Sequence, residues 1–69
     1  MKDTVYELVD YTGVSATTIE DAVGEAIKRA HRCYKRIHWF EVLQTRGSLD
    51  KGRIHHWQVT VRVGVSPGS

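Results

Sequence analysis

Cysteine is nearly absent from this chain of 69 residues, and the single Cys33 excludes an internal disulfide bond. Long hydrophobic runs are also missing, since no apolar stretch approaches the roughly 18 residues that a membrane-spanning helix needs. The first residues lack the apolar region of a secretory signal peptide. These absences suit a reducing compartment, so the sequence predicts a cytoplasmic protein that does not enter a membrane.

Recognised catalytic motifs are missing as well: the chain has no nucleophile elbow, no catalytic triad and no Walker loop. Glu41 and Asp50 are a candidate acid/base pair, but nothing in the sequence places them together, and Asp is a common turn residue. The potential metal ligands follow no recognised zinc spacing; they are His31, Cys33, His38, His55 and His56. We therefore predict neither an enzyme nor a metal site.

The short length predicts one domain over residues 1–69 with a thin core. A chain of this size buries only about 60% of its unfolded surface, and small proteins usually compensate with disulfides, metals or oligomerisation. The net charge of +2 is mild. It is compatible with binding phosphate groups but does not require a nucleic-acid partner.

Hydrophobic patterning predicts a strand, an amphipathic helix and two further strands. These elements are expected at residues 4–12, 17–35, 37–48 and 53–65. Thr17 with Glu20 has capping-box spacing, and Thr18 with Asp21 is the alternative helix start. Residues 13–16 are expected to interrupt the pattern between the first strand and the helix.

The last two strands are predicted to form a hairpin with a four-residue loop at residues 49–52, which pairs Ser48 with Arg53. The expected facing pairs are Phe40 with Val61 and Val42 with Val59 toward the helix, and Trp39 with Arg62 and Leu43 with Gln58 on the other face. This register brings apolar residues together on one side, as a one-sided core needs.

The element order predicts an α+β fold, β-α-β-β, in which a three-stranded antiparallel sheet packs on one helix. The helix is expected to cover the sheet face that carries Phe40, Val42 and the valines of the last strand. Nothing in the chain is left to cover the other face, which carries Tyr6, Leu8, Trp39 and Leu43. An uncovered apolar patch of this kind indicates an interface or a ligand site.

Trp39 is the strongest candidate for binding on that face. Its indole is a rigid flat surface, and Gln58 on the facing strand offers donor and acceptor atoms in one amide. This combination suits a planar heteroaromatic ring. A subunit contact through Trp39 explains the same residues, and the residues alone leave both interpretations open.

The second half of the predicted helix is basic, with Lys28, Arg29, Arg32, Lys35 and Arg36. A solvated face that complements the helix dipole accounts for these charges. The alternative function is an oligomeric nucleic-acid-binding module that uses this basic half of the helix.

The run "WFEVLQTRG", followed after a short turn by "HHWQVTVRVG", resembles the dodecin family of small flavin-binding proteins. The resemblance extends to "YTGVS" before the helix and to the junction "RAHRCYKRIHWFEV". It implies the fold predicted above, assembled into a hollow homododecamer in which paired flavin rings stack between symmetry-related tryptophans.

The resemblance also implies site residues for a flavin, either riboflavin or FMN. The stacking tryptophan corresponds to Trp39 and the flavin-bonding glutamine to Gln58, while Arg46 corresponds to an arginine near the flavin phosphate. His56 matches a histidine before the aromatic-Gln pair, and Glu41 shares the strand face of Trp39. The expected function is flavin storage and sequestration with quenching of the bound ring, and the expected partners are further copies of the chain.

Overall fold

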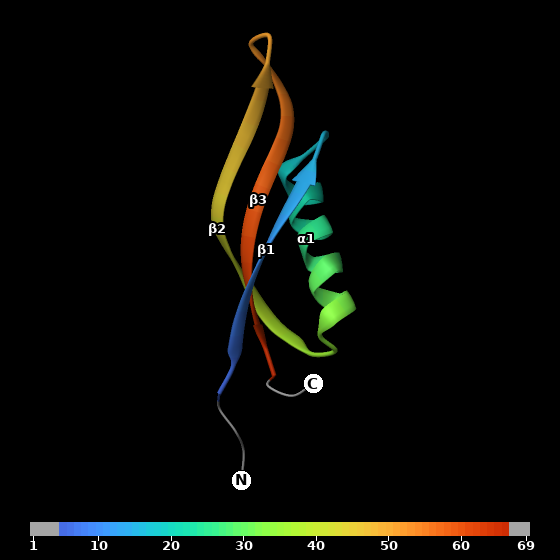
Figure 1. Ribbon diagram of the computed structural model, residues 1–69, viewed down its shortest axis with the longest axis vertical. Coiled ribbons are helices and arrows are strands. Elements are labelled where there is room, and N and C mark those ends of the chain that lie inside the picture. Colours follow the sequence, from blue (N-terminus) through green and yellow to red (C-terminus); the bar gives the residue numbers. More distant parts are fainter. Residues whose placement is uncertain (1–4, 67–69) are drawn as a thin grey trace.

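A computed structural model describes residues 5–66 and shows one helix packed on a three-stranded antiparallel sheet (Figure 1). The elements in chain order are β1 (Glu7–Ser15), α1 (Ile19–Cys33), β2 (Ile37–Asp50) and β3 (Arg53–Val65). β3 lies in the middle of the sheet and is antiparallel to both neighbours. The predicted α+β class and the element order are confirmed.

β1 extends three residues further along the chain than predicted. Residues 13–15 continue the pairing with β3 instead of breaking it, and Gly13 faces Val59. A Cβ at position 13 would collide with the backbone of Ala22 and Ala26. Glycine therefore serves here for close approach of the helix, not for a turn. Thr4, the predicted first residue of the strand, lies outside the described residues.

The start of α1 is set by Thr18, whose side-chain oxygen accepts a hydrogen bond of 2.9 Å from the amide of Asp21. The capping box at Thr17 is wrong, because the amide of Thr17 instead donates to the hydroxyl of Ser15 at 3.0 Å. The helix ends at Cys33, two residues earlier than predicted. Tyr34 is already extended, with φ −133° and ψ 134°.

The β2–β3 hairpin closes through a two-residue turn, Lys51 and Gly52, in place of the predicted four-residue loop. Both residues have positive φ, 52° and 78°, as the type I′ turn that suits twisted hairpins requires. β2 consequently continues to Asp50, which faces Arg53.

The predicted hairpin register is wrong. The observed facing pairs are Phe40 with Val63, Val42 with Val61, Trp39 with Gly64, and Arg46 with Gln58. The register also shifts between Ile37 and Trp39, between Val42 and Gln44, and between Ser48 and Leu49. Valines occupy every second position from Val59 to Val65, so a slip of two residues still matches apolar side chains. The hydrophobic pattern alone could not distinguish these alignments.

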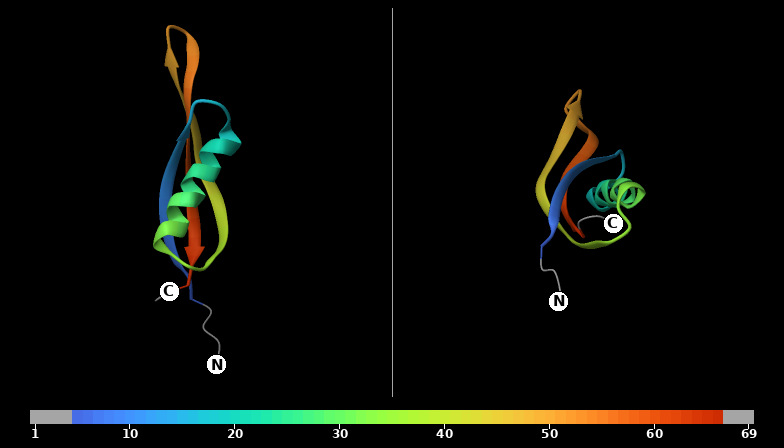
Figure 2. Two further views of the ribbon diagram at one scale, coloured as in Figure 1. Left: turned by 90° about the vertical axis from the view of Figure 1, so that its right-hand side faces the viewer. Right: turned by 60° about the horizontal axis from the view of Figure 1, so that its bottom comes forward.

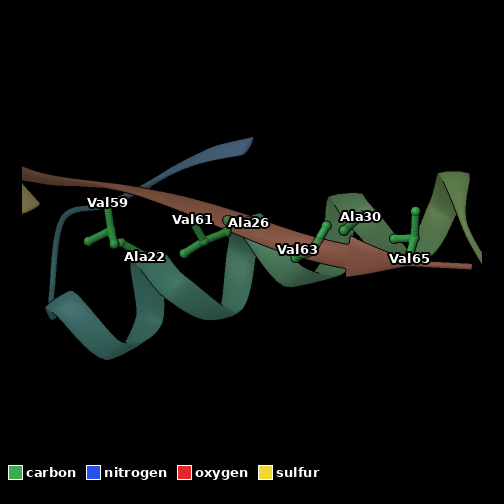
Figure 3. Packing of buried hydrophobic residues seen from close by; sticks show 7 residues of the cluster. All are labelled: Ala22, Ala26, Ala30, Val59, Val61, Val63 and Val65. Carbon is green, nitrogen blue, oxygen red and sulfur yellow. The ribbon is translucent and has the colours of Figure 1, made fainter. Parts of the chain in front are cut away.

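The core consists of small side chains where α1 crosses β3 (Figure 3). Three helix alanines one turn apart meet four alternate strand valines; they are Ala22, Ala26 and Ala30, and Val59, Val61, Val63 and Val65. All seven are at most 1% exposed. Alanine lets the helix lie close to the sheet, and each buried valine contributes roughly 1.5–3 kcal/mol.

The helix covers β1 and β3 but barely touches β2, and Figure 2 shows it on one side of the sheet only. Phe40 and Val42 point to the helix side but remain 51% and 45% exposed. Their predicted burial under the helix is therefore wrong. The sheet face away from the helix, called here the open face, is uncovered as predicted, with exposed Tyr6 and Leu8.

The chain is elongated, with extents of 56 × 19 × 13 Å and a radius of gyration of 14.2 Å. A compact domain of this length has a radius of gyration of about 11 Å. The excess comes from the β2–β3 hairpin, whose tip extends beyond β1 and α1 (Figure 1). This hairpin arm carries Leu49 and Ile54, which are 69% and 58% exposed.

Polar pairs join β1 to β3 across the open face. The Arg62 guanidinium donates to both carboxylate oxygens of Asp10, at 2.8 Å and 3.1 Å. The hydroxyls of Thr12 and Thr60 form a hydrogen bond of 2.8 Å in the next row. The hydrogen bonds from Arg62 lower the pKa of Asp10 below its ordinary value.

We predict that Gly13→Ala destabilises the protein by about 1–3 kcal/mol, because the new methyl group overpacks the contact between β1 and the backbone of α1. Urea unfolding at one fixed protein concentration measures the loss. Gly24→Ala is the matched control, since a Cβ at this helical position meets nothing within 4 Å. It should instead stabilise by up to about 1 kcal/mol through helix propensity. Equal effects of the two changes would contradict the close-packing role of Gly13.

We also predict an acid-dependent contribution from Asp10. Its pKa is lowered in the folded state, so its pairing stabilises the protein above the ordinary carboxyl pKa and loses that effect as pH falls through the folded value. Between pH 5 and pH 3 the wild type should therefore lose more stability than Asp10→Asn. Urea midpoints for both proteins at each pH measure the difference, and parallel losses would refute the assignment.

Candidate functional site

Trp39 lies on the open face and covers Gly64, the residue opposite it on β3. Indole atoms Nε1 and Cζ2 both lie 2.6 Å from the place where a Cβ of Gly64 would stand, and Cε2 lies closer still. Three neighbouring ring atoms so near one point show that a face of the indole, and not its edge, rests on the glycine. One face of the indole is therefore turned toward Gly64.

This placement leaves the other face of the indole directed away from Gly64, and Trp39 is 38% exposed. An immobilised indole with one free face is a stacking platform for another planar ring. Tyr6 stands beside it, with ring centroids 6.2 Å apart and planes at 81°. The two aromatic rings thus stand at nearly a right angle to each other.

The rows next to Trp39 differ in polarity. Leu8 faces Gly64 from the β1 side and is 54% exposed, so its side chain extends the apolar surface around Gly64. Glu41 faces Arg62 in the adjacent row, where Arg62 is already held by Asp10. A ring stacked on Trp39 would therefore have a charged row along one border.

Arg46 and Gln58 form a separate group on the open face, where they are directly opposite each other on β2 and β3. His56 and Ser48 face each other two residues nearer the hairpin tip. The hydroxyl oxygen of Ser48 is buried and has no hydrogen-bond partner among the described residues. Three of the expected site residues, Arg46, His56 and Gln58, are thus neighbours.

The two groups are far apart within one chain. Gln58 and Gly64 are six positions apart on β3, which corresponds to about 20 Å along the strand. The expectation that the Gln58 amide lies within reach of Trp39 on the facing strand is therefore wrong for a single chain. The open face offers an aromatic surface at one end and an amide–guanidinium pair nearer the other.

Sequence reasoning missed Gly64 and the pairing of Tyr6 with Trp39. Gly64 could have been found, because a glycine inside a valine-rich strand indicates a close approach. Its partner could not, because the strand pattern places Trp39 opposite Arg62 unless the turn and the bulges are known. Leu43 is exposed as expected, but it lies at a register shift.

A hollow of about 460 Å³ lies away from Trp39, between α1 and β1. Lys28, Arg29 and Arg32 contribute its basic wall, and Glu25 pairs with Lys28 at 3.3 Å. Burial and a hydrogen bond with Cys33 raise the pKa of nearby Tyr11 to about 12, so its phenol stays neutral. The hollow thus has a positively charged wall.

Within residues 5–66, the candidate acid/base pair Glu41 and Asp50 is separated and no metal-ligand cluster is present. No three side chains of His, Cys, Asp or Glu in that range are placed to share a metal ion. Glu41 faces Arg62, whereas Asp50 lies at the hairpin turn opposite Arg53. Over the same residues, no helix is sufficiently long and apolar to cross a membrane.

Known proteins match the chain over almost its whole length. The dodecin family model matches residues 5–66. The dodecin of Thermus thermophilus is 33% identical over 60 residues, which cover 87% of each protein. The structure of dodecin from Streptomyces davaonensis has a TM-score of 0.83 at 39% identity and covers 88% of this chain and 90% of its own.

Dodecin from Streptomyces coelicolor is similar over a still larger part of the fold. Its TM-score is 0.87 at 34% identity, with 94% of this chain and 93% of that chain covered. The family match spans nearly all of the described residues, and the solved structures share the β-α-β-β architecture. The chain belongs to the dodecin family of small flavin-binding proteins.

Proposed function

We propose that this protein stores and sequesters flavin by stacking riboflavin or FMN against Trp39 between subunits of a homododecamer. The observation that carries the proposal is the indole held on Gly64 with its other face free on a sheet face that the chain does not cover. Stacking on such a platform requires only a planar aromatic partner. A flavin ring meets that requirement.

The residues that would hold the flavin are the five expected from the sequence. Trp39 supplies the stacking face, and Gln58 supplies an amide that can both donate to and accept from the polar ring edge. Arg46, directly opposite Gln58, suits a phosphate or the polar chain of the ligand, with His56 beside it. Glu41 lies in the row next to Trp39.

The separation of Trp39 from Gln58 supports a site made by two chains. A single ring system does not span the roughly 20 Å between the two residues in one chain. Trp39 of one subunit and Gln58 of another can contact the same ring if two open faces meet in opposite directions. The proposed site is therefore incomplete without a second copy.

Exposed apolar surface gives independent support for assembly. Phe40, Val42, Leu49 and Ile54 are each at least 45% exposed, and they continue from the sheet onto the hairpin arm. Both outer strands, β1 and β2, have an edge without a partner strand among residues 5–66. Unprotected edges and apolar patches favour association. The number of twelve subunits rests on the family resemblance.

The proposed mechanism is physical and not chemical. A bound flavin contributes a redox-active and light-absorbing ring, and burial of that ring restricts its contact with oxygen and other molecules. The electron-rich indole of Trp39 would quench the excited ring by electron transfer at stacking distance. We further propose that this one-domain protein acts in the cytoplasm, where an exposed free thiol such as Cys33 stays reduced.

A nucleic-acid-binding module remains the second candidate because Lys28, Arg29 and Arg32 border one hollow. Binding through these residues would weaken steeply with salt and would not depend on Trp39. Flavin binding through stacking would depend weakly on salt. Titration of riboflavin and of a short oligonucleotide at two salt concentrations distinguishes the two functions.

The central prediction concerns Trp39. Trp39→Ala should weaken riboflavin binding by about 1–3 kcal/mol, by analogy with base–aromatic stacking, and should abolish fluorescence quenching. Trp39→Phe should retain part of both. Gln58→Ala should lose about 0.5–1.5 kcal/mol, as expected for one neutral hydrogen bond. Fluorescence titration of oligomer isolated by size-exclusion chromatography measures these effects. Unchanged quenching in the intact Trp39→Ala oligomer would refute the stacking site.

A further prediction concerns Gly64. Gly64→Ala should weaken riboflavin binding by at least about threefold to tenfold. The new methyl group occupies the space of the indole, which can then no longer present its face fully for stacking. Gly47→Ala is the matched control. Gly47 also faces a tryptophan, Trp57, but a Cβ there meets the ring at an ordinary 3.6 Å. Equal binding by both variants would show that Gly64 does not position Trp39.

A further inference from the structure

Tyr6 is close to Trp39 but is not one of the five residues proposed above to hold the flavin. It precedes β1, and continuing the β1–β3 register beyond Glu7 and Val65 places it beside Ser66 on the open face. Its ring is 6.2 Å from that of Trp39 and almost perpendicular to it. Because one face of the indole is turned toward Gly64, Tyr6 stands at nearly a right angle to a ring that is already held in place.

His38 holds Tyr6 in this orientation. The ring centroids of His38 and Tyr6 are 5.1 Å apart, with an edge-to-face angle of 60°. His38 Nε2 lies 2.6 Å from the hydroxyl oxygen of Ser66, a hydrogen-bonding distance. The register shift between Ile37 and Trp39 falls at His38, and bulges commonly redirect a side chain. The imidazole is thus held from one side and supports the phenol ring on the other.

We propose that Tyr6 is a second aromatic wall of the ligand site, which positions a planar heteroaromatic ring on the free face of Trp39. This inference rests on the proposed flavin site and adds a residue to it. A ring on a bare indole can slide and rotate at little cost. The Tyr6 ring, nearly perpendicular to the indole, limits that freedom and adds an edge contact of the kind that aromatic pairs favour.

The wall acts on the ring and not on the side chain of a flavin. Tyr6 is beside the indole, whereas Arg46 and Gln58, the groups suited to polar substituents, lie about 20 Å away in the same chain. Two ligands separate the possibilities, namely riboflavin and lumiflavin, which has the same ring system without the ribityl chain. A wall for the ring affects both to the same degree.

The test compares Tyr6→Leu, Tyr6→Phe and wild type by titrating riboflavin and lumiflavin fluorescence. Tyr6→Leu should weaken both ligands by a similar factor, about threefold to tenfold, because it removes an aromatic contact. Tyr6→Phe should stay within twofold of wild type, because the ring is kept. Ile19→Ala, an exposed position on α1 on the opposite side of the sheet, is the control and should not alter binding.

Several outcomes would overturn the wall. They are unchanged binding by Tyr6→Leu, a loss confined to riboflavin, or an equal loss in Tyr6→Phe. If Tyr6→Leu fails to assemble, His38→Ala is tested instead. That change keeps the Tyr6 side chain but removes the imidazole that orients it. It should weaken both ligands by the same factor, and unchanged affinity would again overturn the inference. Failure of the flavin site itself gives a different result. In that case wild type would not quench flavin fluorescence, or Trp39→Ala would bind riboflavin as tightly as wild type does.

Discussion

The structure depends on a difference in length between a helix and a strand. A helix advances about 1.5 Å per residue and a strand about 3.3 Å. The 15 residues of α1 therefore cover about 22 Å, whereas the 14 residues of β2 extend over about 46 Å. One helix cannot cover a sheet of this size, and it packs where the fit is best, over β1 and β3. The exposed residues of β2 and the free hairpin arm follow from that mismatch.

Glycine controls how closely the layers and side chains approach. Gly13 brings the backbone of α1 against β1, which allows alanines to pack on the valines of β3. Gly64 provides the space in which the Trp39 indole lies flat. Larger residues at either position would collide with backbone or ring atoms. The aromatic platform is thus created by an absent side chain on the neighbouring strand as much as by the tryptophan.

The division of the open face explains how one small chain can bind a ligand that it cannot surround. An aromatic group around Trp39 and a polar group around Gln58 lie at different distances along the same hairpin. In the proposed function each group alone is an incomplete site that a second copy completes. The same exposed surface therefore serves the proposed assembly and the proposed ligand site.

The sequence by itself determined the class of fold, the order of its elements and the uncovered face with Trp39. Periodicity reports burial locally, so the bounds of β3 were predicted without error. The tertiary structure decided the register, because alternate valines make a slip of two residues invisible in the pattern. It also decided the helix cap, since the Ser15 hydroxyl accepts from the amide of Thr17 and leaves Thr18 to cap α1. The position of Trp39 over Gly64, and its distance from Gln58, depend on bulges that arise from packing between strands and that no local pattern encodes.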